Sequence, residues 1–197
     1  MSQFDEDTHI LAILDEIGHG SKFLVDIGAR LVGSNSAMLL NDYGWRGVLF
    51  DADPDAAAEL RREFPQCEVH GLAVTPVCIH AYVPPETHFL SIDVDGQDWW
   101  LWAALARRPA LVVIETNPLD GHFVAPFRMS PGRDPAAGYG CSVESAKALG
   151  AMKGYDYLGR TAVNAFFCRS DLKCGYRLPE AGRHRGKMTI SAGNVMA

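Results

Sequence analysis

Apolar residues along this chain fall into short uninterrupted runs, separated by segments in which they recur every three or four positions. Uninterrupted runs are typical of strands buried on both faces of a sheet, whereas the wider spacing is typical of amphipathic helices. The runs predict strands at 23–27, 47–50, 67–74, 88–94 and 111–115, with a short further strand at 79–83 before Pro84.

Helical spacing fills the intervals between the predicted strands. One apolar stripe predicts a lead-in helix within residues 1–20, capped by Asp7 or Thr8 and ended by Gly18. Further helices are predicted from Ala37 with Ser34 or Asn35 as cap, over 54–64 with Asp53 as cap, over 98–107 with Asp98 as cap, and over 143–152.

Two closing strands, 155–161 and 165–169, are joined by a tight connection and predict a hairpin. The strands and helices before them alternate, which indicates βαβ units with helices on both faces of a sheet. We therefore expect one α/β domain over residues 1–172. It should be Rossmann-like and doubly wound, with a mainly parallel sheet and an antiparallel last strand.

Two segments do not follow this alternation. Residues 118–141 are rich in proline and glycine and show no period, which is typical of a substrate loop or lid. Residues 173–197 form a C-terminal tail for which the pattern predicts no element.

Composition and charge narrow the classes of function. The chain has 197 residues, of which 48% are hydrophobic, and its net charge is −6. Nucleic-acid binders carry a basic face that neutralises phosphates, so nucleic acid is not an expected partner. No apolar stretch approaches the roughly 20 residues of a membrane span, and the acidic start differs from a secretory signal, so we expect a cytoplasmic protein. The five cysteines lack a C-x-x-C pair, which favours reduced thiols.

The first predicted strand runs directly into Gly28, and a second glycine follows at Gly33. Glycine at such a point lets a ligand approach the backbone closely. A dinucleotide site would show the pattern G-x-G-x-x-G, which is absent here. The loop therefore favours a ligand without a pyrophosphate over a nicotinamide cofactor, and a tight structural turn is the alternative interpretation.

Acidic residues follow three of the predicted strands. Asp51 comes after the second strand, at the distance from the first glycine where an acidic residue binds ribose in nucleoside sites. Asp93 and Asp95 lie where the fourth strand ends, and Glu115 ends the fifth. Because the carboxyl ends of parallel strands meet at one edge, these carboxylates should share a crevice. They could orient or deprotonate a substrate hydroxyl or hold a divalent metal, and His122 in the proposed lid is a further candidate base.

The order and spacing of these pieces resemble the FkbM-type group of class I S-adenosylmethionine-dependent methyltransferases. The matching stretches are 23–29, 44–54, 89–96, 113–118, 154–155 and 164–167. The resemblance implies a seven-stranded sheet with an antiparallel last strand and S-adenosylmethionine as cofactor. It implies that Asp26, Gly28 and Ala29 line the methionine end, that Asp51 binds the ribose and that Asp93 lies near the methyl group. The remaining cofactor contacts that it implies are Gly33, Asn35, Ala52 and Ala73.

We expect from this an enzyme that methylates an oxygen of a small molecule or sugar. Asp93 or Glu115 would position or deprotonate the acceptor, with His122 as reserve base. If a divalent metal takes part, Asp93, Asp95 and Glu115 are its expected ligands. The alternative is a non-catalytic binding or scaffold protein with this fold, because Arg30 and Leu31 are bulky for a cofactor loop and could block the pocket. The expected partner is a small-molecule acceptor rather than a membrane, and a homodimer is compatible with the sequence.

Overall fold

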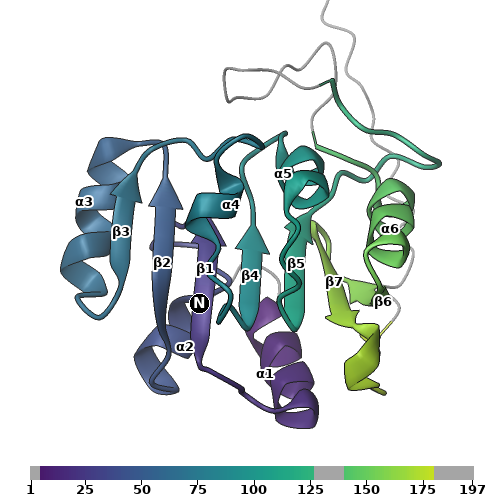
Figure 1. The fold of residues 1–197 in the computed structure, drawn as a ribbon, viewed down its shortest axis with the longest axis horizontal. Helices are drawn as coiled ribbons and strands as arrows, with labels where there is room; N and C mark the ends of the chain where they lie inside the picture. Colours follow the sequence, from purple (N-terminus) through teal and green to yellow (C-terminus); the bar gives the residue numbers. More distant parts are fainter. Residues whose placement is uncertain (1–4, 127–139, 180–197) are drawn as a thin grey trace, which may run out of the picture.

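Seven strands form one mixed sheet in the computed structural model, which describes residues 5–126 and 140–179. They are β1 (Phe23–Ile27), β2 (Arg46–Asp51), β3 (Glu68–Gly71), β4 (Phe89–Ile92), β5 (Leu111–Glu115), β6 (Tyr155–Arg160) and β7 (Asn164–Arg169). Their order is β3-β2-β1-β4-β5-β7-β6, and β7 runs antiparallel to β5 and β6 (Figure 1). The predicted Rossmann-like, doubly wound architecture with an antiparallel last strand is confirmed.

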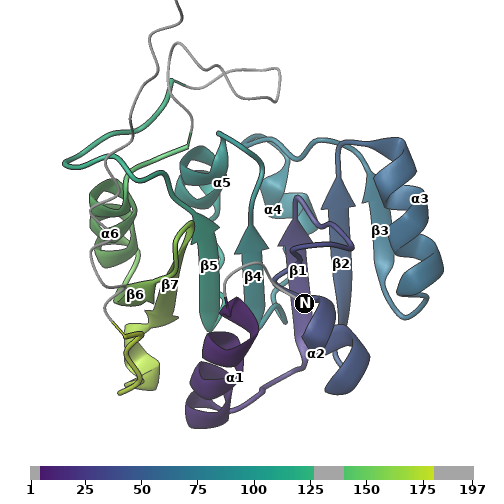
Figure 2. The same ribbon diagram turned by 180° about the vertical axis from the view of Figure 1, so that it is seen from behind.

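Helices cover both faces of the sheet. The helices are α1 (Glu6–Ile17), α2 (Ala37–Asp42), α3 (Pro54–Glu63), α4 (Ile79–Tyr82), α5 (Asp98–Ala104) and α6 (Val143–Met152), and a 3₁₀ turn (Ser170–Leu172) follows β7. The core cluster on one face contains residues of α1, α2 and α3, and the cluster on the other face contains residues of α4, α5 and α6 (Figures 1 and 2). None of the helices in the described ranges is long and apolar enough to cross a membrane.

The central strands β1, β4 and β5 are buried at every position. Successive side chains enter opposite layers, so that Leu24 belongs to the cluster with α1 and Val25 to the cluster with α5. Because both faces are covered, both sets of side chains must be apolar, which explains the uninterrupted runs in the sequence.

The prediction of a strand at 79–83 is wrong, since this segment contains helix α4. Ile79 and Val83 are fully buried four positions apart, whereas His80 between them is exposed. The amide of Val83 donates to the carbonyl of Ile79, the bond of a helical turn. A short apolar run fits either period, and here the helical one is correct.

The structure confirms the predicted cap of α3 but not those of α1 and α2. Asp53 caps α3 by accepting from the amide of Asp55, as predicted. Ser34 accepts from the amides of Ser36 and Ala37, but Ser36 occupies the N-cap position of α2, so the prediction of Ser34 or Asn35 as its cap is wrong. Helix α1 begins one residue before Asp7, with Asp5 at the N-cap position, so the prediction of Asp7 or Thr8 as its cap is wrong.

The two irregular segments are described only in part. Of the predicted lid 118–141, residues 127–139 lie outside the described residues, as do 180–197 of the tail. The first residues of the tail pack on the domain. The Tyr176 hydroxyl contacts Nδ1 of His9 at 2.8 Å, and the amide of Leu178 donates to the carbonyl of Leu158 at 2.8 Å.

Candidate active site

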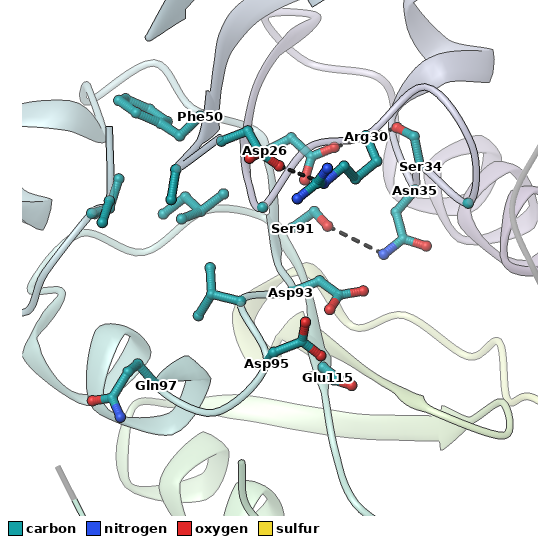
Figure 3. Close-up of a pocket in the computed structure, with 18 of the residues that line it drawn as sticks. Asp26, Arg30, Ser34, Asn35, Phe50, Ser91, Asp93, Asp95, Gln97 and Glu115 are labelled. Carbon is teal, nitrogen blue, oxygen red and sulfur yellow. Dashed lines mark hydrogen bonds and ion pairs between the residues drawn. The ribbon is translucent and has the colours of Figure 1, made fainter. Parts of the chain in front are cut away.

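A cavity of about 460 Å³ opens at the carboxyl ends of β1, β2, β4 and β5, the edge where the sequence places the acidic residues. Figure 3 shows Phe50 on one side, Ser34 and Asn35 on the other, and Asp93, Asp95 and Glu115 together below them. The predicted site residues that line it are Asp26, Gly28, Gly33, Asn35, Asp51, Ala52, Ala73, Asp93, Asp95 and Glu115. Residues at or after the ends of five strands, β1 to β5, therefore line one crevice.

Asp26 lies at the bottom of the cavity, near the end of β1. Its carboxylate is nearly inaccessible to solvent and accepts hydrogen bonds from the hydroxyls of Ser36 at 2.5 Å and Ser34 at 3.4 Å. Burial raises the pKa of Asp26 to about 6, because a charged carboxylate loses its hydration there, and the serine hydroxyls offset part of that rise. The group therefore titrates close to neutral pH.

Asn35 follows Ser34 and is equally buried. Its amide nitrogen donates to the hydroxyl of Ser91 at 3.2 Å, a contact that joins the first loop to β4 (Figure 3). Its carbonyl oxygen has no hydrogen-bond partner among the described residues. A buried acceptor without a partner destabilises the fold by about 1–3 kcal/mol, so a ligand that donates to it would be favoured.

Asp51 ends β2 and is 4% exposed. One of its oxygens accepts from the amide of Asp53 at 2.7 Å, and the other contacts Nε of Arg30 at 2.7 Å. Arg30 lies in the loop after β1 and is 55% exposed, and its Nη1 is 3.8 Å from Asp53. The side chain that the sequence assigns to ribose thus has an internal cation as its partner.

Three carboxylates meet at the ends of β4 and β5. Oxygen atoms of Asp93, Asp95 and Glu115 all lie within 4.8 Å of one another. Glu115 is buried, whereas Asp95 is exposed and has a left-handed backbone with φ 56°. Carboxylates grouped in this way can orient a hydroxyl group or hold a divalent cation.

The turn that carries Asp93 and Asp95 is held from within by Asp98. This fully buried carboxylate accepts from the amides of Val94 at 2.8 Å and Gly96 at 2.9 Å. Burial raises the pKa of Asp98 to about 6, although the backbone donors oppose the rise. The prediction of Asp98 as the cap of α5 is therefore wrong. Gln97 occupies the N-cap position, and Asp98 points back into the turn.

Gly28 joins the two sides of the cavity. Its φ is 91°, and a Cβ atom built on it would lie 1.7 Å from the carbonyl oxygen of Asp93. The amides of Gly28 and Ala29 both donate to the carbonyl of Phe50. No other residue fits this close approach of three strand ends, which gives the glycine seen in the sequence its physical reason.

Two predicted site residues lie elsewhere. Ala29 is buried in the core cluster below the loop and does not line the cavity, because its backbone turns inward to bond with β2. His122 is exposed and lines a separate shallow hollow beside Glu144 and Lys147 of α6. The structure thus does not bring His122 together with the carboxylates that it was expected to assist.

Several lining residues were not predicted as ligand contacts. Arg30 stood out in the sequence only as an unusually bulky loop residue, and Ser34 only as a cap. The others are Ile27, Val32, Phe50, Leu72, Val74, Ser91, Val94, Gln97 and Val163. Phe50, Ser91 and Ile27 sit at strand ends, so their position in the predicted strands was the available signal. Val163 reaches the cavity from the β6–β7 turn, which sequence spacing does not reveal.

Solved structures with the same fold are S-adenosylmethionine-dependent methyltransferases. The amino pentose methyltransferase CalS10 of Micromonospora echinaspora, solved with S-adenosylmethionine bound, has a TM-score of 0.57 and 13% identity, covering 86% of this chain and 92% of its own. The 1,6-didemethyltoxoflavin-N1-methyltransferase of Burkholderia thailandensis, with S-adenosylhomocysteine bound, has a TM-score of 0.55 and 12% identity, covering 83% and 77%.

The mitomycin 7-O-methyltransferase MmcR has a TM-score of 0.51 and 20% identity over 83% of this chain, which spans about half (53%) of that enzyme. No family model matches the chain, and no curated protein matches its sequence. The strand order 3-2-1-4-5-7-6 with antiparallel β7 and these structural matches together show that the chain has the class I S-adenosylmethionine-dependent methyltransferase fold.

Proposed function

We propose that the protein is an S-adenosylmethionine-dependent methyltransferase of the FkbM type that methylates an oxygen of a small molecule or sugar. One observation carries the proposal. The cavity of this methyltransferase fold brings Asp51, Gly28 and the carboxylates of β4 and β5 into one crevice. Its volume of about 460 Å³ lies within the usual range of small-ligand sites, roughly 300–1,000 Å³.

The lining of the cavity fits the chemistry of this cofactor. Phe50, Leu72 and Val74 offer an apolar wall that would hold the adenine ring. Asp51 would accept hydrogen bonds from the ribose hydroxyls. Asp26 and the unpaired carbonyl oxygen of Asn35 make the opposite end electronegative, which would favour the ammonium group of the methionine part.

Asp93 and Glu115 would act on the acceptor. When bound, the cofactor supplies a methyl group on a sulfonium, which is electrophilic without further activation. The protein must therefore position the acceptor oxygen and remove its proton. Asp93 and Glu115 lie close enough together to face the same acceptor hydroxyl, and Glu115 is shielded from water. The acceptors in the names of the similar structures, among them mitomycin and an amino pentose, support a small molecule.

Calorimetric titration with S-adenosylhomocysteine tests the cofactor site. We expect saturable binding by the native protein, and a loss of about tenfold or more in affinity for Asp51→Ala, since a charged acceptor is removed from the ribose. Asp55→Ala is the matched control, because Asp55 is an exposed carboxylate in the first turn of α3. Absence of binding at high ligand concentration by the native protein would refute the proposal.

The methylated atom requires a separate experiment. The protein is incubated with a panel of sugars, phenols and amines and with cofactor carrying a ¹³C-labelled methyl group. The carbon chemical shift of the product separates oxygen methylation from nitrogen methylation. A product labelled only on nitrogen would leave the cofactor assignment intact and overturn the assignment of oxygen as acceptor.

A metal-assisted variant of the same function uses the same three carboxylates. Asp93, Asp95 and Glu115 would be the ligands of a divalent cation, which would bind and acidify the acceptor hydroxyl in place of a protein base. Chelation by EDTA distinguishes the two arrangements. Transfer that needs a cation stops and is restored by Mg²⁺, whereas transfer that relies on a carboxylate base continues.

The ion pair between Arg30 and Asp51 favours one further candidate, a binding or scaffold protein that keeps the fold without using the cofactor. Such a protein would bind neither S-adenosylhomocysteine nor adenosine. The same titration therefore separates the two candidates.

A further inference from the structure

Arg30 lines the cavity, and its guanidinium contacts Asp51, the residue proposed above to bind the ribose. We propose that Arg30 is an internal competitor for the ribose subsite, so that its guanidinium must leave Asp51 before the diol of a ribose can bind there. Arg30 then determines both the affinity for nucleoside ligands and how far that affinity depends on the ribose hydroxyls. This inference rests on the proposed cofactor site and adds a specificity-determining residue to it.

The hydrogen bonds of Asp51 explain why the two partners exclude each other. Asp51 is 4% exposed, and the amide of Asp53 already holds one of its oxygens. Arg30 Nε, 2.7 Å away, covers the other oxygen, and Arg30 itself lines the cavity (Figure 3). A ribose diol recognised by a carboxylate donates two hydrogen bonds to it. With only a narrow part of the carboxylate open to the cavity, the guanidinium and the diol compete for the same oxygen.

The surroundings of Arg30 explain why it can leave. Its side chain is 55% exposed, and its second contact, Nη1 to Asp53, is long at 3.8 Å. Asp53 keeps its place without Arg30, because its other oxygen caps α3. A long cationic side chain that rotates into water recovers its hydration, so its release costs little beyond the lost pair. The loop between Gly28 and Gly33 also has left-handed glycine at both ends.

Two consequences follow for ligand selection. Adenosine binds more weakly than it would to a free Asp51, because part of its binding energy replaces the ion pair. A nucleoside without the hydroxyls, such as 2′,3′-dideoxyadenosine, does not need to displace Arg30. The native protein therefore discriminates less between the two ligands than a variant without the guanidinium.

The test is titration of adenosine, 2′,3′-dideoxyadenosine and S-adenosylhomocysteine into the native protein and the Arg30→Met variant. We expect Arg30→Met to bind adenosine and S-adenosylhomocysteine about threefold to tenfold more tightly, the range set by one half-exposed ion pair. Its affinity for the dideoxy ligand should be unchanged. Arg107→Met is the matched control. Arg107 is exposed between α5 and β5, at the amino ends of the parallel strands and thus opposite the cavity.

Ionic strength gives an independent readout. Salt screens the attraction between the half-exposed Arg30 and Asp51. Raising the ionic strength from about 0.05 to 0.5 M should therefore tighten adenosine binding to the native protein slightly and leave Arg30→Met unchanged. A double-mutant cycle with Asp51→Asn completes the test. Once Asp51 has lost its charge, removing Arg30 should no longer improve affinity.

The outcomes separate this inference from the proposed function. Weaker or unchanged adenosine binding by Arg30→Met, with S-adenosylhomocysteine still bound by the native protein, would mean that Arg30 contacts the ligand or is irrelevant to it. That result overturns the competition and leaves the cofactor site standing. Absence of nucleoside binding by the native protein and by Arg30→Met would overturn the cofactor site itself. Thermal unfolding of each variant shows that the fold is intact.

Discussion

The two sides of the cavity are built in opposite ways. The loop of residues 30–36 after β1 presents serine, asparagine and a half-exposed arginine, and Arg30, Asn35 and Ser36 contact the rest of the site through their side chains. The turn of residues 93–98 after β4 is instead held by one buried carboxylate, which takes two backbone amides as donors. Backbone donors do not rotate away, so the turn is preformed, whereas the loop can exchange its partners when a ligand arrives.

This difference assigns the two sides to different tasks. The proposed chemical step needs fixed carboxylates, and the turn supplies Asp93 and Asp95 on a rigid frame beside Glu115. The proposed binding step needs a site that can open, and the loop supplies a displaceable arginine. Gly28 connects the two sides, because it packs against the carbonyl of Asp93.

Removing that connection should have the largest effect. In Gly28→Ala the new methyl group would collide with the carbonyl of Asp93, and φ 91° would be strained for alanine as well. We expect a loss of more than about 3 kcal/mol in the free energy of unfolding, measured by urea denaturation. Gly44→Ala is the control, since φ is 68° there but no atom lies within 4 Å of its Cβ position. It should lose about 1–2 kcal/mol. Equal losses in both variants would contradict a close approach at Gly28.

The rigid turn is tested next, through Asp98. Asp98→Ala leaves the amides of Val94 and Gly96 without their acceptor in a buried place, and we expect it to lose about 2 kcal/mol of stability. Asp55→Ala, which removes an exposed carboxylate from the first turn of α3, should change stability by less than about 0.5 kcal/mol. A loss confined to Asp55→Ala would show that Asp98 does not hold the turn.

The pH dependence of stability provides a second measurement on Asp98. Its pKa is raised from 3.8 to about 6 in the fold, so the folded state binds the proton more tightly than the unfolded state. The stabilisation due to protonated Asp98 is therefore complete below about pH 4 and is lost as the pH rises through about 6. Asp98→Asn should flatten the part of this slope that Asp98 contributes.

The sequence predicts the acidic residues at the strand ends but not the contact between Arg30 and Asp51. Strand ends follow from uninterrupted apolar runs, so acidic residues placed directly after them, such as Asp51, Asp93 and Glu115, could be assigned to one crevice. The contact of Arg30 with Asp51 joins residues on different elements and depends on the path of a loop. No periodicity encodes that path, so Arg30 was noticed only for its size.

Two wrong predictions, the cap of α5 and the strand at 79–83, have the same physical origin: the local sequence fits two structures equally well. Asp98 follows a glycine turn and is the first residue of α5, and a carboxylate there can bond forward into the helix or back into the turn. The tertiary fold buries it and selects the backward bonds. The segment 79–83 was ambiguous in the same way, because two buried positions four apart fit a helix as well as a short strand.

Asp26, which accepts hydrogen bonds from the loop after β1, should have a smaller, pH-dependent effect on binding. Burial raises the pKa of Asp26 to about 6, so the carboxylate becomes neutral as the pH falls below that value. A neutral Asp26 no longer attracts the ammonium group of S-adenosylhomocysteine. We expect its affinity to fall by about threefold to tenfold between roughly pH 7.5 and pH 5, and adenosine, which has no ammonium group, to be less affected. Asp26→Asn should remove the difference, and equal pH dependence for both ligands would place the ammonium elsewhere.

The smallest effect is expected at His122, which lies on neither side of the cavity. His122 is exposed in the hollow beside Glu144 and Lys147, whereas Asp93 and Glu115 line the cavity. His122→Ala should therefore change the affinity for S-adenosylhomocysteine by less than about twofold, as distant sites act independently. The rate of methyl transfer between about pH 6 and pH 8 should keep its native profile, because His122 lies outside the cavity in which the acceptor would lose its proton. A profile that loses its imidazole-like step in the variant would place His122 in the chemistry, and the segment that carries it would then have to reach the carboxylates during turnover.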